Sequence, residues 1–506
     1  MTVTRPATRS MEGPDAEPPV ALRESSAKAP WRELGGFLLV SLLVRLCVLV
    51  LDARPRFFLG DSESYLETAV GFWLPNDRSW MYGLLINALL RWSHTLKSII
   101  LLQTLASAAL CASIAGFCRR VGVRSWIAWA ALLVLSVEPM LLYYDRSIMT
   151  DAPGTVVVVV GIVLAASWMV RASWRALIGS AVCFWAAICL RTALLPLVFW
   201  VPAFVVTWAA VGAVRSGMRD AWRQRIAGPA ALLAASAFGV IGYAFANGVA
   251  TNSAPSLNPR GGAFMLGRIA PILAPEDFAG IGVANPAQLL EETRHADRRL
   301  RNWQVFGAQG LIPRLEEALG DSGKVSRAGA LLVRRSIARD PLGFAELVCG
   351  QGSEYLSFAP YRAHLSGQLG LDRPLPASLV SSLGRKVREP IDSGLPWRPS
   401  LVLTGLRRAV GWPPVLCWLA VVAPGAVLAS WRRWRPCSQA AILLVATTTW
   451  IYATSVFTLS LELVPRYLLP LVPLAGALVA CAVEAALRRT TSPRIAVDSA
   501  REFAHR

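Results

Sequence analysis

Long apolar runs, separated by short polar connections, occupy most of the chain. Each run is close to the length that an α-helix needs to cross a bilayer, about 20 residues. The runs lie near 35–51, 97–118, 125–143, 153–170, 174–190, 192–213, 227–246, 412–430, 439–460 and 467–487. The pattern predicts an all-α polytopic membrane protein with about ten transmembrane helices. Only Arg191 separates two of the runs, so one long helix at that place would change the count by one.

Arginine-rich connections alternate with connections that also carry acids. The basic ones are 119–124, 171–175, 215–225, 431–435 and the segment after 487. Cytoplasmic loops of membrane proteins are enriched in Lys and Arg. The alternation therefore predicts a multi-pass protein of the inner or plasma membrane with both termini in the cytoplasm. The connections 52–80, 143–152, Arg191 and 461–466 then lie on the outer face.

The same pattern divides the chain into five parts. They are a disordered cytoplasmic tail at 1–34, an N-terminal transmembrane module at 35–246, an outer segment at 247–411, C-terminal spans at 412–487 and a cytoplasmic tail at 488–506. The outer segment has apolar positions at helical spacing over 287–305 and 326–356, with a break at Pro341. We expect a mostly helical extracytoplasmic domain there.

Composition agrees with this class. Hydrophobic residues make up 54% and charged residues 16% of the 506 residues, whereas soluble domains carry about 25% charge. An ordinary soluble enzyme and a largely disordered chain are therefore excluded. The net charge of +19 is explained by basic cytoplasmic loops, and no nucleic-acid partner is expected. The 9 cysteines contain no CxxC pair, so neither a zinc site nor a disulfide framework is indicated.

Candidate chemistry gathers in the outer connections. The first contains Asp61, Glu63 and Tyr65, and it ends near Arg78; the second ends at Asp151. The later ones contain Arg191 and the pair Arg466-Tyr467. Arginine binds phosphate through its forked donors, and a carboxylate accepts a proton from an attacking hydroxyl. Together they suit a reaction on an anionic, lipid-linked substrate.

Each of these residues also has a purely structural explanation. Asp61 and Asp151 stand where helix N-caps are expected. Glu63 lies one helical turn before Glu67, as on a solvated helix face, and Asp77-Arg78 has the form of a surface ion pair. Arg191 and Arg466 are placed to extend toward the membrane interface. These explanations stay open at the level of single residues.

The order of these features resembles the GT-C superfamily of integral-membrane glycosyltransferases. The likeness is strongest to the bacterial branch related to protein O-mannosyltransferases and lipid A aminoarabinose transferases. The stretches that carry it are 60–69, 78–85, 148–151, 190–195 and 465–473, the last reading Pro-Arg-Tyr-Leu-Leu-Pro-Leu-Val-Pro. The resemblance covers 35–215 and the C-terminal spans, whereas 247–411 matches no family that we can name.

The resemblance implies a GT-C-like fold and a role for each candidate. Asp61 would be the general base on the acceptor hydroxyl, and Asp151 would orient the acceptor or help to bind a metal. Arg191 and Arg466 would hold the donor phosphate, with Arg78 in a supporting role. Tyr65, Glu63 and Tyr467 complete the expected substrate-binding set.

The implied reaction moves a sugar from a polyprenyl-phosphate donor to an extracytoplasmic lipid, glycan or protein, with inversion at the anomeric carbon. No cofactor is certain, and a divalent metal at Asp61 and Asp151 is left open. The chain departs from relatives of the family in two places. Ser62 separates Asp61 from Glu63, and Ser79-Trp80-Met81-Tyr82-Gly83 replaces a common Pro-Pro-Gly-Tyr-Pro, so the acceptor stays undefined.

Two other functions remain as alternatives. A polysaccharide polymerase or ligase would place its basic residues in the large outer segment, which contains Arg298, Arg299, Arg301, Arg334 and Arg335. A transporter or flippase of lipid-linked sugars would need polar groups at mid-depth and paired broken helices. The sequence contains no inverted repeat that we can detect, and its charges gather at one face.

Overall fold

The computed structural model describes residues 29–504, except for 59, 76, 217–218, 295–300, 361–374, 389–390, 392–400, 410 and 461–462. Most of the predicted N-terminal tail therefore lies outside the described residues. Within them the chain forms helices and no strands. The all-α class is confirmed.

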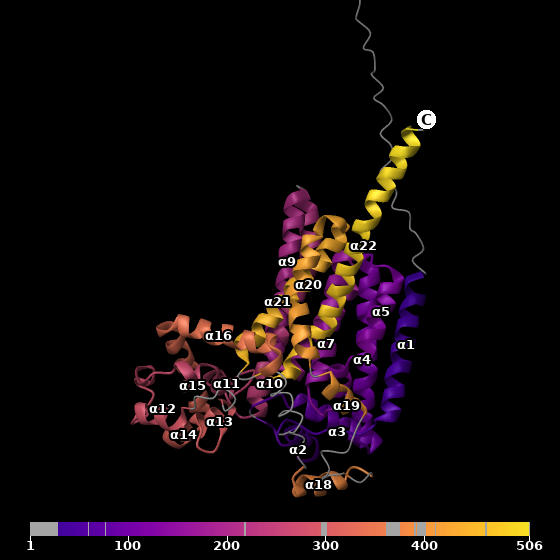
Figure 1. Cartoon of the computed structure of the whole chain (residues 1–506). Coiled ribbons are helices and arrows are strands. Elements are labelled where there is room, and N and C mark those ends of the chain that lie inside the picture. Colours follow the sequence, from indigo (N-terminus) through magenta and orange to yellow (C-terminus); the bar gives the residue numbers. More distant parts are fainter. Residues whose placement is uncertain are drawn as a thin grey trace, which may run out of the picture.

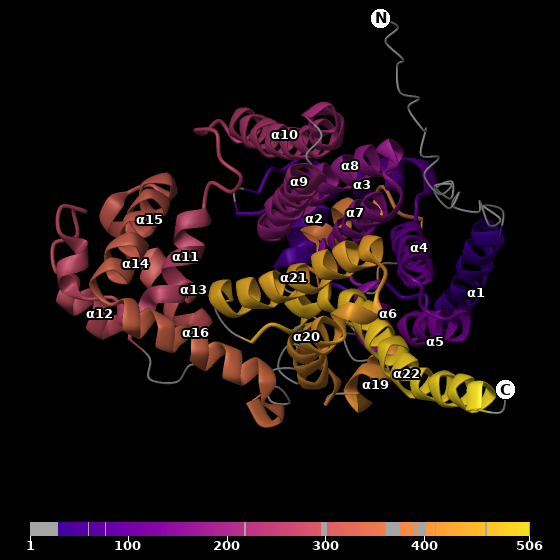
Figure 2. The ribbon, with the colours of Figure 1, turned by 90° about the horizontal axis from the view of Figure 1, so that it is seen from above.

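Eight helices among the described residues are long and apolar enough to cross a membrane. They are α1 (Ala29–Leu51), α4 (Lys97–Val121), α7 (Asp151–Arg171), α9 (Leu195–Ser216), α10 (Arg219–Ala250), α20 (Trp412–Ala429), α21 (Pro436–Leu459) and α22 (Leu471–Ala504). Two shorter apolar helices are α5 (Ser125–Ser136) and α8 (Trp174–Leu190). The chain is thus a multi-pass membrane protein, and its helices form the upright bundle of Figure 1, seen along its length in Figure 2.

The predicted span at 125–143 is not one helix. The chain forms α5 and then a separate short helix, α6 (Pro139–Tyr144), with Glu138 extended between them at ψ 123°. Proline disfavours the helical conformation of the residue before it, which explains the break at Pro139. The boundary at Arg191 is a true break, because its backbone is extended at φ −153° and ψ 106°. Runs 174–190 and 192–213 are therefore separate helices.

Three of the five predicted basic connections meet at one end of the bundle. Arg488 near the end of the apolar part of α22 donates hydrogen bonds to the carbonyl oxygens of Gly122 (2.6 Å) and Arg433 (3.0 Å). Both acceptors lie in connections that the sequence assigns to the same side. The α22 helix continues past the predicted span end at 487, to Ala504. Which side of the membrane this end faces stays a prediction.

Two short helices, α2 (Asp61–Gly71) and α3 (Met81–Ser93), pack together at the opposite end. Tyr65 and Tyr82 meet edge to face, with their ring centroids 5.1 Å apart. The helix α18 (Ala377–Gly384) covers them and shares their hydrophobic core, while α19 (Leu401–Arg408) packs on α6. These contacts hold the first outer connection against the ends of the spans.

A helical lobe, residues 261–356, stands beside the bundle (Figure 1). It contains α11 (Gly261–Ile269), α12 (Pro286–Thr293), α13 (Arg301–Phe306), α14 (Leu311–Leu319), α15 (Ser322–Arg339) and α16 (Pro341–Leu356). The predicted break at Pro341 is confirmed, because Pro341 is the first residue of α16 and Asp340 caps it through the Gly343 N–H (2.8 Å). Residues 295–300 of the predicted helical stretch 287–305 lie outside the described part.

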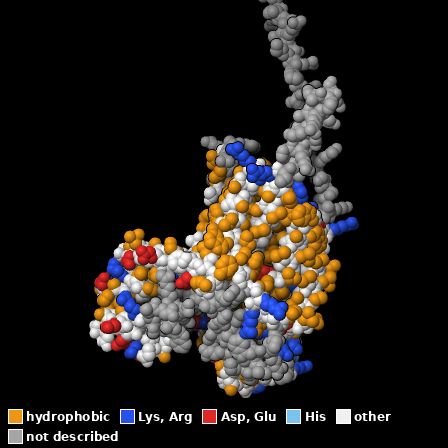
Figure 3. Space-filling model, in the orientation of Figure 1, with side chains coloured by type: hydrophobic (Ala, Val, Ile, Leu, Met, Phe, Trp, Pro, Cys, Tyr) orange, Lys and Arg blue, Asp and Glu red, His pale blue; other side chains and the backbone are white. Residues whose placement is uncertain are grey.

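The lobe has its own hydrophobic core, and buried hydrogen bonds tie it to the bundle. Arg268 is 1% exposed and donates to the carbonyl oxygens of Leu347 (2.9 Å) on α16 and Phe457 (3.0 Å) on α21. Figure 3 shows charged side chains spread over the lobe, whereas hydrophobic side chains dominate the visible surface of the bundle. The bundle therefore has the surface that contact with lipid requires.

Helices α11 and α15 approach so closely that only glycine fits at their crossing. A Cβ atom at Gly329 would lie 2.6 Å from the carbonyl oxygen of Gly262. We expect Gly329→Ala to lower the free energy of unfolding by about 1–3 kcal/mol, the usual cost of overpacking. At Gly261 a Cβ atom would be 3.8 Å from its nearest neighbour, so Gly261→Ala is the matched control. Thermal unfolding of both variants in detergent checks this, and equal transition temperatures would contradict it.

Candidate functional site

The first two of the connections that are predicted to lie on the outer face are paired with each other along their backbones. The Arg56 N–H donates to the Arg146 carbonyl (2.8 Å), and the Ile148 N–H donates to the Arg56 carbonyl (2.9 Å). The Ser62 hydroxyl then donates to the carbonyl of Ile148 (2.9 Å). Each connection leads within a few residues into a helix that begins with an aspartate. The pairing therefore brings Asp61 and Asp151 into one region.

Neither aspartate is a helix N-cap. The cap position of α2 is Gly60, whose φ of 69° is a left-handed conformation that favours glycine. The cap position of α7 is Thr150, and Asp151 is the first helical residue. The capping explanation of both acids is thus wrong. A carboxylate in the first turn is still stabilised by the helix dipole.

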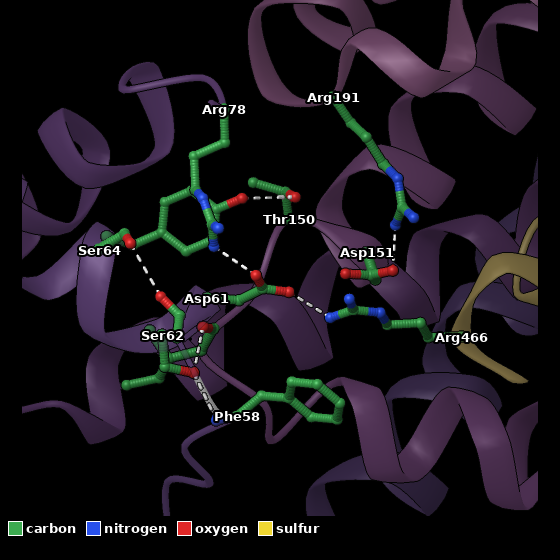
Figure 4. Close-up of polar contacts among 12 residues, drawn as sticks. Phe58, Asp61, Ser62, Ser64, Arg78, Thr150, Asp151, Arg191 and Arg466 are labelled. Carbon is green, nitrogen blue, oxygen red and sulfur yellow. Dashed lines mark hydrogen bonds and ion pairs between the residues drawn. The ribbon is translucent and has the colours of Figure 1, made fainter. Parts of the chain in front are cut away.

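Both carboxylates are instead paired with arginines that arrive from distant segments (Figure 4). Arg78 and Arg466 contact different oxygens of Asp61, and Arg191 contacts Asp151. The side chain of Asp61 is 23% exposed, whereas that of Asp151 is only 5% exposed. Arg466 lies between the two acids in Figure 4. The structure therefore joins five of the six predicted charged residues, all except Glu63, into one cluster.

Aromatic side chains surround the guanidinium groups. The Arg466 guanidinium lies 4.5 Å from the ring centroid of Phe58, and the Tyr467 ring lies 5.0 Å from Arg191 and 5.5 Å from Arg466. A guanidinium over a ring face is stabilised by the ring quadrupole. The Tyr65 hydroxyl meets the Thr150 hydroxyl at 3.1 Å and so connects α2 to the start of α7. Tyr65 and Tyr467 thus belong to the cluster as predicted.

Glu63 is the one predicted site residue that does not belong to the cluster around Asp61 and Asp151. No hydrogen bond or ion pair connects it to the cluster among the residues that the structure describes. Burial and the neighbouring Glu63 charge raise the pKa of Glu67, which places the two acids on one side of α2. The explanation of Glu63 and Glu67 as a shared helix face fits better.

The charges around Asp61 control its ionisation. Burial by itself raises the pKa of Asp61, because it disfavours the charged form. The guanidinium charges of Arg466 and Arg78 outweigh burial and hold the pKa below its ordinary value of 3.8. Asp61 is therefore ionised at neutral pH.

Arg78 itself is held in place from two sides. Asp77 binds its guanidinium at 2.7 Å, and the backbone carbonyl of Asp77 accepts a hydrogen bond from the Asn258 side chain (2.7 Å). The Trp80 indole donates to Asn247 at the end of α10 (3.1 Å). The Asp77-Arg78 pair is thus part of an anchored segment rather than an isolated surface pair.

Sequence reasoning missed a buried ion pair beneath the second connection. Arg45, in the middle of α1, contacts Asp145, and both side chains are 0% exposed. Asp145 also accepts from the Ser107 hydroxyl (2.6 Å), and its carbonyl accepts from Gln103 (2.9 Å). The Arg45–Asp145 ion pair thus holds Asp145 in place, directly before Arg146, whose carbonyl pairs with the Arg56 backbone. The sequence did contain a sign of this pair, a single arginine inside the first apolar run. Charged residues at membrane depth are rare and usually have a function.

The side chains of this cluster are better suited to bind an anion than a metal ion. Both Asp61 and Asp151 face guanidinium groups, and the described part of the chain contains no group of three or more His, Cys, Asp or Glu side chains that could hold a metal. Three arginines close together are, in contrast, a common arrangement for phosphate.

Comparisons with known proteins add no assignment. No model of a known protein family matches this chain, and no curated protein sequence matches it. The function is therefore argued from the site itself.

The ion pairs of Asp61 predict how stability depends on pH. A carboxylate with a lowered folded-state pKa contributes stability above its unfolded pKa, and this contribution is lost as pH falls through the folded value. We expect wild type to unfold at a higher temperature than Asp61→Asn at neutral pH, and the difference to shrink as pH falls below about 4, the unfolded-state pKa of aspartate. Thermal scans of both proteins over this range measure it. A difference that persists unchanged in acid would contradict the ion pairing.

Proposed function

We propose that this protein is a GT-C-like membrane glycosyltransferase that transfers a sugar from a polyprenyl-phosphate donor to an acceptor hydroxyl on the outer face of the membrane. The observation that carries the proposal is the cluster itself. Asp61 is paired with Arg78 and Arg466, next to the Asp151–Arg191 pair, at one end of an apolar bundle. A lipid-linked anion would bring its tail along the spans and its phosphate to these arginines.

The cluster is charge-balanced before any donor binds. Arg78, Arg191 and Arg466 are matched by Asp61, Asp77 and Asp151. An incoming phosphate would compete with Asp61 for the same guanidinium groups. The Nε of Arg466 is buried without a hydrogen-bond partner among the described residues, and a phosphate oxygen would satisfy it.

This competition would couple donor binding to activation of the base. While two guanidinium groups hold Asp61, its pKa is lowered and it accepts a proton poorly. When the guanidinium of Arg466 turns to the phosphate, the pKa of Asp61 rises toward its ordinary value. The carboxylate becomes a better base only when the donor is in place.

The proposed reaction is a single displacement. The acceptor oxygen attacks the anomeric carbon from the side opposite the phosphate, and its proton passes to Asp61. The bond from the anomeric carbon to the phosphate oxygen breaks, and polyprenyl phosphate leaves with the electron pair. Arg191 and Arg466 stabilise the leaving charge, and Asp151 orients Arg191. Attack from the opposite side inverts the anomeric centre.

The structure gives less support to the two alternatives, a polysaccharide polymerase or ligase and a transporter or flippase. In the lobe, Arg335 donates to the carbonyls of Asp277 (2.8 Å) and Ala279 (2.6 Å), so it stabilises the lobe. Arg298 and Arg299, which the polymerase or ligase alternative also needs, lie outside the described residues. The joined charges stand at one end of the bundle, an arrangement that suits transfer at one face better than transport across it.

Loss of the base should make the donor accumulate. We expect polyprenyl-phosphate sugar, measured by mass spectrometry of extracted lipids, to rise equally in cells lacking the protein and in cells that carry only Asp61→Asn. General-base removal costs about 10²–10⁴-fold in rate. Glu63→Gln is the matched control and should behave as wild type. If the null strain accumulates the lipid but Asp61→Asn does not, the base is another residue; if neither changes, the donor assignment fails.

We expect Arg466 to bind the donor phosphate through the forked N–H groups of its guanidinium and not through its charge alone. Arg466→Lys keeps the charge but loses the fork, so we expect the KM for the donor to rise about tenfold, the loss of one hydrogen bond to a charged group. Arg260→Lys is the control, because Arg260, just before the lobe, is partly exposed and paired with Glu316. Initial rates with purified protein in vesicles measure both. An unchanged donor KM in Arg466→Lys would remove Arg466 from the phosphate site.

A further inference from the structure

The outward side of α16 has a row of exposed apolar residues, next to the exposed Glu346 and Ser353, that no part of the described chain covers. Leu342 is 76% exposed, and Ala345 and Cys349 follow it at helical spacing, both exposed. Phe358, just beyond the helix, is 54% exposed. The inner face is also apolar, because Phe344 packs against the core of the lobe. A helix that is apolar on both faces is normally covered on both.

Two neighbouring helices of the lobe, α14 and α15, expose mostly charged side chains. The outward positions of α15 include Arg327, Arg334 and Arg339, and α14 exposes Glu317 at 70%. Their surfaces are those of helices that face water. The exposed apolar residues therefore distinguish α16 from α14 and α15, whereas α11 also exposes Phe264 (40%) and Met265 (39%).

The position of α16 indicates what covers this face. Its axis crosses the direction of the spans in Figure 1, and Figure 2 shows it lying across the view from above. It packs against the spans α20 and α21. A helix in this orientation lies parallel to a membrane surface.

The end of α16 joins the lipid-facing surface of the spans. The Trp418 indole on α20 donates to the Leu356 carbonyl (3.0 Å), and Trp418 itself is 48% exposed. Leu459, at the end of α21, is 46% exposed. The end of α16 thus meets side chains that a bilayer must cover, and tryptophan is typical of the membrane–water interface.

We propose that α16 is an interfacial helix, whose Leu342, Ala345 and Cys349 face lies in the headgroup region of the bilayer and docks the lobe on the membrane. Such helices bury their apolar face roughly 5–10 Å into the boundary between headgroups and acyl chains. Glu346, which is exposed on the same side, extends to the aqueous edge of this layer.

Docking at α16 also sets the depth of the candidate site. The Tyr355 hydroxyl in the last turn of α16 donates to Ser460 (3.1 Å) and accepts from the Val464 N–H (3.0 Å). Val464 comes two residues before Arg466. The helix that rests on the lipid therefore holds the segment that leads into the arginine cluster. The proposal itself does not depend on the reaction assigned to that cluster.

The exposed Cys349 provides a native reporter for the test. The background replaces with alanine the other cysteines that are exposed or half-buried, which are Cys47, Cys183, Cys189 and Cys437. An environment-sensitive fluorophore is attached to Cys349 in the full chain, which is reconstituted in phosphatidylglycerol–phosphatidylethanolamine vesicles. Quenching is measured with doxyl-labelled lipid and, separately, with aqueous iodide. The matched control carries Glu317→Cys and Cys349→Ser, which moves the label to the water-facing side of α14.

We expect doxyl lipid to quench the label at Cys349 more than about twofold better than the label at position 317, and iodide to show the reverse order. Equal and strong iodide quenching at both positions would overturn the proposal, because it would place α16 in water. Protection from iodide without quenching by doxyl lipid would also overturn it, since a protein partner or a second copy would then cover the face. Leu342→Glu in the Cys349-labelled protein should reduce the lipid quenching.

Discussion

The ion pair between Asp61 and Arg466 connects residues that are 405 positions apart. Each charge alone, largely withdrawn from water at the end of an apolar bundle, would carry a large desolvation cost, and the pairing offsets it. For the two residues to meet, the first outer connection and the segment after α21 must be held at the same end of the bundle. The packing of the spans, of α2 and α3 and of the segment after α21 together brings Asp61 and Arg466 into contact.

Two layers of polar contacts support the pair from beneath. The backbone pairing of Arg56 with residues 146–148 aligns the connections that carry the two aspartates. Under it, the fully buried Arg45–Asp145 pair ties α1 to the second connection, and Ser107 on α4 completes the bonding of that carboxylate. Removing one partner of a buried pair costs much more than removing both. The site thus depends on charges inside the spans as well as on those at its surface.

The proposed chemistry and the proposed docking meet at one short segment. Residues 463–467 run from the Tyr355 contact to Arg466 and Tyr467, and so connect the lobe to the arginine cluster. A reaction on a lipid-linked donor needs its phosphate site at a constant depth relative to the headgroups. A helix that rests on the bilayer and contacts this segment supplies that reference.

The sequence by itself determined the class of the protein and most of the charged residues of the site. Apolar runs of membrane-spanning length are a local property, and so are acids and arginines confined to alternate connections. It did not determine the break at Pro139, the partners of each charge, the exclusion of Glu63 or the importance of Arg45. Those depend on contacts between segments far apart in the chain, which no local pattern encodes. Only the packing of the helices decided which arginine reaches which carboxylate.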